Sequence, residues 1–230
     1  IYGGAFGSGG EGSIDNLSVV EVGQDWILGT GWSIGDDKAI SDNSGSGVRN
    51  LRQNGIVTIG KTYKITFDAN ITSGIPSLIF GGTTVIVSGI NTFYKVATSA
   101  DFQIRNASSN FIGSISNITV EEVGQNWILD DGCSITAQGT RILSDGTNKY
   151  FQQLGALVVG DTYEMEYEIT ESVSGTLSVT GTFGSGITLK NTVGVHKFYA
   201  VATSTTLQIK RAGACDITID NIIIKRLTGD

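Results

Sequence analysis

The sequence contains few residues of the types on which most active sites and metal sites depend. Its 230 residues include one histidine, His196, one proline, Pro76, and two cysteines. Structural zinc usually requires several cysteines or histidines, and nucleophilic hydrolases require a base beside the nucleophile. No such arrangement surrounds His196, whose counterpart in the internal repeat described below is Asn91. The sequence therefore predicts a protein that is not an enzyme.

Charged residues are also few, and the sequence has no long apolar segment. Charged residues make up 16% of the chain, against roughly 25% in ordinary soluble proteins. The formal net charge is −7, and no basic cluster occurs that could neutralise phosphates, so we expect no nucleic-acid partner. No run of roughly 18 apolar residues occurs, and we expect no membrane insertion.

The main feature that the sequence does have is internal repetition. Segments return after about 100 residues, which is the size of a domain rather than of a solenoid turn. We therefore predict three parts: the C-terminal strands of a partial repeat over 1–23, a first repeat over 24–124 and a second over 125–230. The partial copy also favours a piece of a longer protein. The matching pairs are Gln24–Leu28 with Gln125–Leu129, Phe93–Ser99 with Phe198–Ser204, and Gly12–Gly23 with Gly113–Gly124.

Local patterns predict strands throughout. Tyr63–Ala69 alternates apolar and polar residues with period two, as a half-buried strand does. The 32 glycines, with many Ser, Thr and Asn residues, supply turns between such segments. The predicted fold class is all-β, with tandem antiparallel β-sandwich domains of the jelly-roll kind.

One motif points to a nucleotide site but is better explained as a turn. Gly55–Thr62 fits the phosphate-loop pattern G-x-x-x-x-G-K-T. That motif works between a strand and a helix, whereas an alternating strand follows here. The second repeat has Asp161 in place of Lys61, and a carboxylate would repel phosphate. We predict a turn between two strands.

Three glutamates form the most acidic stretch. Glu164, Glu166 and Glu168 alternate with apolar residues, so all three face the same side of a strand. Paired carboxylates could act on a glycoside. The first repeat has Lys64, Thr66 and Asp68 there, so the acidic face is not shared, and we interpret it as a solvated outer face.

Four aromatic residues are candidates for carbohydrate binding, because sugar rings stack on indole and phenol rings. Trp26 and Trp127 occur in both repeats, which also suits a place in the core. Trp32 and Tyr150 occur in one repeat only, which suits copy-specific binding. Asp15 and Asp220, each in an Ile-Asp-Asn sequence, are candidate oxygen ligands for a structural calcium ion, although Asp-Asn is also common in turns. We expect no other cofactor.

The two cysteines both lie in the second repeat. In a jelly roll the first and last strands commonly lie side by side, so a disulfide bridge between Cys133 and Cys215 is one alternative. Two buried free thiols are the other, and the first repeat has Trp32 where the second has Cys133.

Two segments carry a resemblance to known families. Ile14–Val22, running into Trp26–Ile34, resembles the repeat junction of bacteriophage tail-fibre and other virion appendage proteins. Val57–Ala69 resembles the central strands of CenC-like carbohydrate-binding modules, which have the galactose-binding type of jelly roll. The resemblance covers both full repeats and the opening stub. It implies a calcium role for Asp15 and Asp220, from which Ser116 departs in the middle copy.

Two hypotheses of function follow. The first is a non-catalytic virion structural protein, a tail fibre or appendage on the virion surface that contacts host surface glycans. The resemblance implies that it forms a homo-oligomer, often a trimer, and meets other virion proteins. The alternative is an extracellular bacterial carbohydrate-binding or adhesin region attached to a larger protein. A catalytic or anchoring domain in flanking sequence would favour the alternative.

Overall fold

The computed structural model describes residues 25–44, 49–106, 110–124, 126–185 and 187–227. These residues form strands, turns and bends, with no helix, and so none of them belongs to an apolar helix of membrane-spanning length. The partial repeat predicted for residues 1–23, with its candidate ligand Asp15, lies outside the described residues. The prediction of an all-β fold with tandem antiparallel sandwiches is confirmed.

The first sandwich consists of two five-stranded sheets. The first sheet has the order β1 (Ile27–Leu28), β4 (Arg49–Gln53), β9 (Phe102–Asn106), β6 (Ser77–Ile79) and β7 (Thr83–Val85). The second has the order β2 (Trp32–Gly35), β3 (Lys38–Ser41), β10 (Ile112–Val123), β5 (Thr62–Ser73) and β8 (Gly89–Val96). Neighbouring strands in both sheets are antiparallel.

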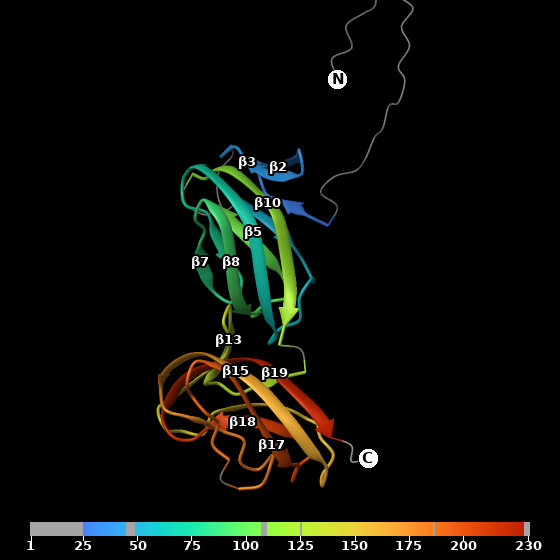
Figure 1. Cartoon of the computed structure of the whole chain (residues 1–230). Helices are drawn as coiled ribbons and strands as arrows, with labels where there is room; N and C mark the ends of the chain where they lie inside the picture. Colours follow the sequence, from blue (N-terminus) through green and yellow to red (C-terminus); the bar gives the residue numbers. More distant parts are fainter. Residues whose placement is uncertain (1–24, 45–48, 107–109, 125, 186, 228–230) are drawn as a thin grey trace, which may run out of the picture.

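The second sandwich repeats this plan with one strand fewer. Its first sheet has the order β11 (Ile128–Leu129), β14 (Tyr150–Gln153), β18 (Leu207–Arg211) and β16 (Leu177–Ser178). Its second has the order β12 (Cys133–Thr136), β13 (Gly139–Ser144), β19 (Cys215–Leu227), β15 (Thr162–Ser174) and β17 (Gly194–Val201). Each sheet takes its strands from one repeat, and the two sandwiches lie end to end (Figure 1).

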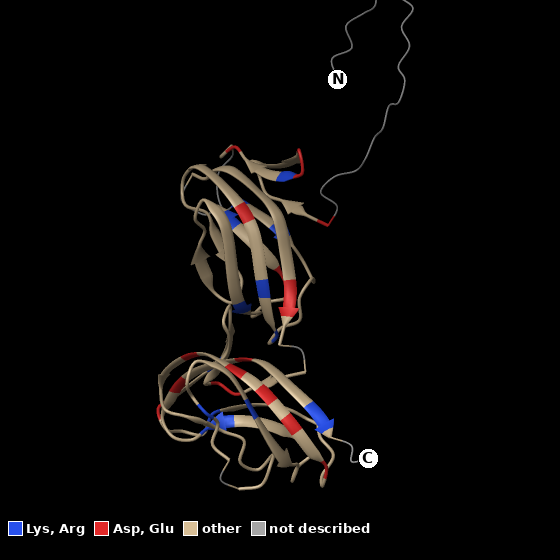
Figure 2. Ribbon diagram, in the orientation of Figure 1, with Lys and Arg blue, Asp and Glu red and all other residues tan. Residues whose placement is uncertain are grey.

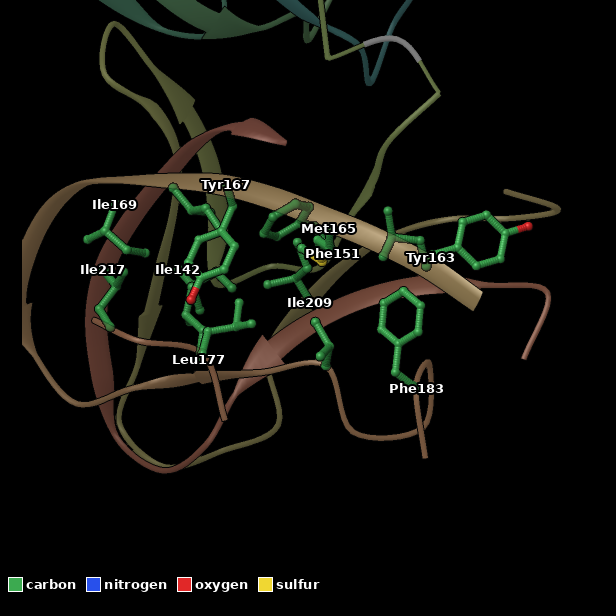
Figure 3. Packing of buried hydrophobic residues seen from close by; sticks show 14 of the residues in the cluster. Ile142, Phe151, Tyr163, Met165, Tyr167, Ile169, Leu177, Phe183, Ile209 and Ile217 are labelled. Atoms are coloured by element: carbon green, nitrogen blue, oxygen red, sulfur yellow. The ribbon is translucent and has the colours of Figure 1, made fainter. Parts of the chain in front are cut away.

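The period-two pattern of the central strands produces the two cores. In β15 the buried side chains are Tyr163, Met165, Tyr167 and Ile169, and they alternate with less buried ones. They pack against Phe151, Ile209 and Ile217 from other strands (Figure 3). The same alternation in β5 buries the side chains of Tyr63, Ile65, Phe67 and Ala69. Burial of apolar side chains between two facing sheets is the main favourable contribution to such a fold.

The phosphate-loop look-alike is a turn, as the sequence predicted. Residues 54–61 connect β4 to β5, and no helix follows them. The backbone N–H of Thr58 donates a hydrogen bond to the hydroxyl oxygen of Tyr63 at 2.8 Å. In the second repeat Val158 donates to Tyr163 in the same way at 2.9 Å. The turn therefore has the same structural role in both repeats.

Candidate functional site

A groove beside Trp26 is the candidate binding site of the first sandwich. Its volume is about 450 Å³, and it is open to solvent on one side. The register of the sheet creates it, because Ser116 of β10 pairs with Lys38 of β3 and thereby brings the β2–β3 hairpin beside the middle of β10. The lining residues are Trp26, Ile34, Gly35, Asp36, Asp37, Lys38, Ala39, Ile115, Ser116, Asn117 and Ile118.

Trp26 is the aromatic residue among the apolar side chains that line this groove. Its indole makes a T-shaped contact with the ring of Phe102 in the core, with a centroid distance of 5.9 Å and an interplanar angle of 82°. The side chain is only partly buried, and the remaining surface lines the groove. An indole fixed on one side and open on another can stack on the apolar face of a sugar ring.

Asp36 and Asp37 supply the charge at the rim. Both are exposed, and they form the two-residue turn between β2 and β3, with φ angles of 50° and 58°. Two successive positive φ values are the requirement of a type I′ hairpin turn, which aspartate tolerates better than most residues. The exposed Lys38 follows directly. The rim therefore presents two hydrogen-bond acceptors and one donor to the groove.

Asn117 lies at a bulge of β10 and also lines the groove. Its φ is 54°, the register of the pairing with β5 shifts there, and its side-chain amide donates to Asp68 Oδ2 at 2.6 Å. Asn221 has the same role in β19, with a φ of 49° and a 2.7 Å hydrogen bond to Glu168. The shared asparagine thus fixes a β-bulge, which bends the strand locally.

This geometry does not fit the calcium site implied by the resemblance. Asp220 lies at the bulge within β19, exposed, rather than before a terminal strand. Calcium takes six to eight oxygen ligands. No group of three or more Asp, Glu, His or Cys side chains that could hold a metal occurs in the part of the chain that the structure describes. The carboxylate of Glu168, instead of being free to bind a calcium ion, accepts a hydrogen bond from the side chain of Asn221.

The other three candidate aromatics lie elsewhere. Trp32 is only 7% exposed and packs on Phe111 at 5.7 Å, so its proposed role in sugar binding is wrong: its ring is a core side chain. Trp127 packs on Phe151 at 4.8 Å and lines a cavity between the two repeats. Tyr150 is half-buried in β14, away from the groove at Trp26.

Both cysteines are free thiols, as in the second alternative, but only Cys215 is buried and Cys133 is partly buried. Cys133 of β12 pairs with Ile142 along one edge of β13, and Cys215 of β19 pairs with Ser144 along the other edge. Because β13 lies between them, the two cysteines are at least two strand spacings apart, about 9.6 Å, whereas a disulfide requires Cα atoms within roughly 6.8 Å. Burial raises the pKa of Cys133 to about 12, so its thiol stays protonated at neutral pH.

The three glutamates of β15 are held by hydrogen bonds and ion pairs. Lys197 contacts Glu164 at 2.9 Å and Glu166 at 3.2 Å. Hydrogen bonds from Tyr199 and then from Lys197 lower the pKa of Glu164. A general acid for glycoside hydrolysis needs a raised pKa instead. The interpretation as an outer polar face therefore agrees with their contacts.

The sequence pattern indicates Trp26 as a candidate but does not indicate its neighbours Asp36, Asp37, Lys38 and Asn117. Two aspartates between the alternating segments Trp32–Gly35 and Lys38–Ser41 are a recognisable hairpin signal. That signal predicts the turn. It does not predict that the turn lies beside Trp26, because this depends on pairing between strands far apart in the sequence.

Comparison with known proteins gives no family. No protein-family model matches the chain, and no curated protein matches its sequence. Two solved structures align over most of their length. One is a candidate secreted protein from Parabacteroides distasonis, at 8% identity over 90% of this chain and 96% of that one, with a TM-score of 0.21. The other is a protein of unknown function of the DUF861 family from Pseudomonas syringae pv. tomato, at 10% identity over 90% and 95%, with a TM-score of 0.15. Scores this low carry no argument about fold or function.

Proposed function

We propose that this protein is a non-catalytic structural protein, a tail fibre or appendage of a virion, built from tandem β-sandwich modules. The observation that carries the proposal is the short connection between two sandwiches that lie end to end. β10 ends at Val123 and β11 begins at Ile128, so only four residues separate the last strand of one sandwich from the first strand of the next. A short connection limits the relative motion of two modules and suits a stiff spacer.

The virion assignment rests on the resemblance of Ile14–Val22 and Trp26–Ile34 to repeat junctions of virion appendages. Its partners would be further copies of itself and other virion proteins. The test is mass spectrometry of purified phage particles from the source strain, followed by immunogold labelling with antibodies against this chain. Labelling along a fibre or at the tail supports the proposal. Finding the chain in culture supernatant joined to a hydrolase or a cell-wall anchor, and not in particles, overturns it.

The second candidate function is binding of extracellular glycans, either by the appendage or by a bacterial carbohydrate-binding module. The groove at Trp26 favours it, since a partly exposed indole lines the same groove as two carboxylates and one lysine. Binding to a glycan array, followed by calorimetry with the best ligand, tests it. Trp26→Phe should weaken binding by about tenfold, the lower end of what a stacking contact contributes.

Trp127→Phe is the matched control for that experiment. It makes the same change at the equivalent residue of the second repeat, whose ring faces the cavity between the repeats. Equal losses with both variants would place the binding surface elsewhere. Absence of binding to every glycan tested would leave the groove without this function and would not affect the proposal of a structural appendage.

A further inference from the structure

The junction inside this chain shows how one module is seated on another. Gly124, at the end of the first sandwich, lies against Ile135 of the second: a Cβ atom built on Gly124 would be 2.1 Å from Ile135 Cδ1. Tyr94 and Val96 line one side of a cavity of about 700 Å³ between the repeats, and Trp127 lies on the other side. We call the surface around Trp127 and Ile135 the receiving surface of the second sandwich.

The first sandwich has an equivalent receiving surface. Trp26 and Ile34 correspond to Trp127 and Ile135, and both line the open groove described above. The backbone also enters the two sandwiches in the same conformation, since the φ angle is 67° at Asp25 and 70° at Asn126. In the part of the chain that the structure describes, no other sandwich covers the surface around Trp26.

The second sandwich has an equivalent of the end that is seated. We call this its seating end, formed where β15 begins and β17 and β19 end. Tyr199 and Val201 occupy the places of Tyr94 and Val96, and they are 60% and 49% exposed. An exposed tyrosine and valine at this end supply apolar contact area of the kind that interfaces use.

The charges of these two surfaces are complementary. An ion pair at the end of each sandwich is reversed between the repeats: Lys61 with Glu122 at 3.5 Å in the first, and Asp161 with Arg226 at 2.6 Å in the second. The residue before Glu122 in the first repeat is Glu121, whereas the residue before Arg226 in the second is Lys225. The seating end of the second sandwich therefore presents two exposed basic side chains at the end of β19 (Figure 2).

The receiving surface of the first sandwich has an excess of acidic groups at its rim: Asp36 and Asp37 are exposed beside one exposed lysine, Lys38, and Asp25 is exposed next to Trp26 in the sequence. Figure 2 shows acidic residues at the tip of the β2–β3 hairpin, at the opposite end of the described chain from the basic end of β19. A chain with opposite charges at its two ends favours contact between unlike ends and disfavours contact between like ends.

We propose that the seating end of one copy's second sandwich docks on the receiving surface at Trp26 of another copy, so that copies of this chain associate head to tail. The contact joins two different surfaces and need not close, so it produces a series of growing oligomers rather than a single dimer or trimer. This inference does not rest on the virion assignment, because it concerns only two surfaces of this chain.

Sedimentation velocity and light scattering of the full chain over a wide range of concentration test the proposal. The mean mass should rise continuously with concentration at low salt and fall at roughly 0.5 M salt, where the Debye length is only a few ångströms. A zero-length carbodiimide crosslinker should join Asp36 or Asp37 of one copy to Lys225 of another. Mixing isotopically labelled and unlabelled protein identifies crosslinks between copies.

The sequence itself supplies the variant. Asp161→Lys, Lys225→Glu and Arg226→Glu together give the second seating end the charges of the first, Lys61, Glu121 and Glu122, and keep an ion pair in place. The net charge changes by −2, since Asp161→Lys contributes +2 and each of the other two substitutions contributes −2. Self-association should weaken at least about tenfold. Lys190→Glu, an exposed site between β16 and β17, changes the net charge equally and should have no effect.

Three results would overturn the proposal. One is a monomer at every concentration, as expected if another part of the chain covers the Trp26 surface. Another is a closed dimer or trimer of constant mass that the triple variant does not alter. The third is crosslinking between copies through residues other than those of the two surfaces.

Discussion

Removing the hydroxyl of Tyr163 tests whether the turn after β14 is held as the structure describes. Tyr163 is 5% exposed, its ring packs on Phe183, and its hydroxyl oxygen accepts the N–H of Val158 at 2.9 Å. Tyr163→Phe keeps the ring and deletes only this acceptor. The Val158 side chain is 51% exposed, so we expect water to reach the freed N–H.

The expected loss is therefore that of one net hydrogen bond, about 0.5–1.5 kcal/mol, rather than the larger penalty of a buried unsatisfied donor. For a sandwich of this size, a loss of about 1 kcal/mol lowers the melting temperature by roughly 4–8 °C. The amide of Val158 should also exchange with deuterium faster, because its hydrogen bond to the tyrosine is gone.

Calorimetry and residue-resolved hydrogen exchange provide the two readouts. The two sandwiches can unfold separately, so the unfolding transition of each sandwich has to be resolved and assigned. Tyr63→Phe is the matched change in the first repeat, where Thr58 donates to the tyrosine, and it should affect the first transition alone. Tyr94→Phe, on the outer face of β8, should stay within about 0.5 kcal/mol of the wild type.

An unchanged transition together with unchanged exchange at Val158 would refute the reasoning, since the hydrogen bond would then contribute nothing. A loss above about 3 kcal/mol would also refute it, because that magnitude belongs to disrupted core packing rather than to one hydrogen bond.

Three further predictions concern the second sandwich. Phe151→Ala, at a fully buried ring against Trp127, should cost about 3–5 kcal/mol in the free energy of unfolding, and an unchanged denaturation midpoint by Trp fluorescence would contradict the packing. Hydrogen bonds from Arg141 lower the pKa of Asp216 from its ordinary 3.8, so the stability that this pair contributes is complete above pH 3.8 and is lost as the pH falls through the lowered pKa. Asp216→Asn should therefore make the melting temperature depend less steeply on pH in that acid range. An equally steep dependence in the variant would argue against the pair. Because burial raises the pKa of Cys133 to about 12, Ellman's reagent at neutral pH should react with the thiols only after unfolding, and rapid reaction in the native state would show that this cysteine is accessible as a thiolate.

The inward and outward faces of the strands were predictable from the sequence because the side-chain period of a strand is two. Alternation in Tyr63–Ala69 predicts the buried row of β5, and the same rule puts Glu164 and Glu166 on the outer face of β15. The identity of the turn residues also follows from local chemistry, as at Gly55–Thr62. These features depend on neighbours within a few residues.

The candidate site could be predicted only in part. Trp26 stands out in the sequence as a shared tryptophan, yet its neighbours Asp36 and Asn117 come from a hairpin and from a strand more than 90 residues away. Trp32 stands out equally but is buried, because Phe111 packs on it from the other end of the repeat. A period of two assigns a side chain to a face and leaves open what covers that face.

Repetition and alternation in the order of the residues are enough to predict a duplicated all-β chain. Which strands are neighbours depends on the tertiary structure. β13 separates the two cysteines, and the pairing of Ser116 with Lys38 places the acidic hairpin beside Trp26. The physical reason is that strand pairing is a long-range choice: register and order are set by how two sheets bury their inner faces together, and no short segment contains that information.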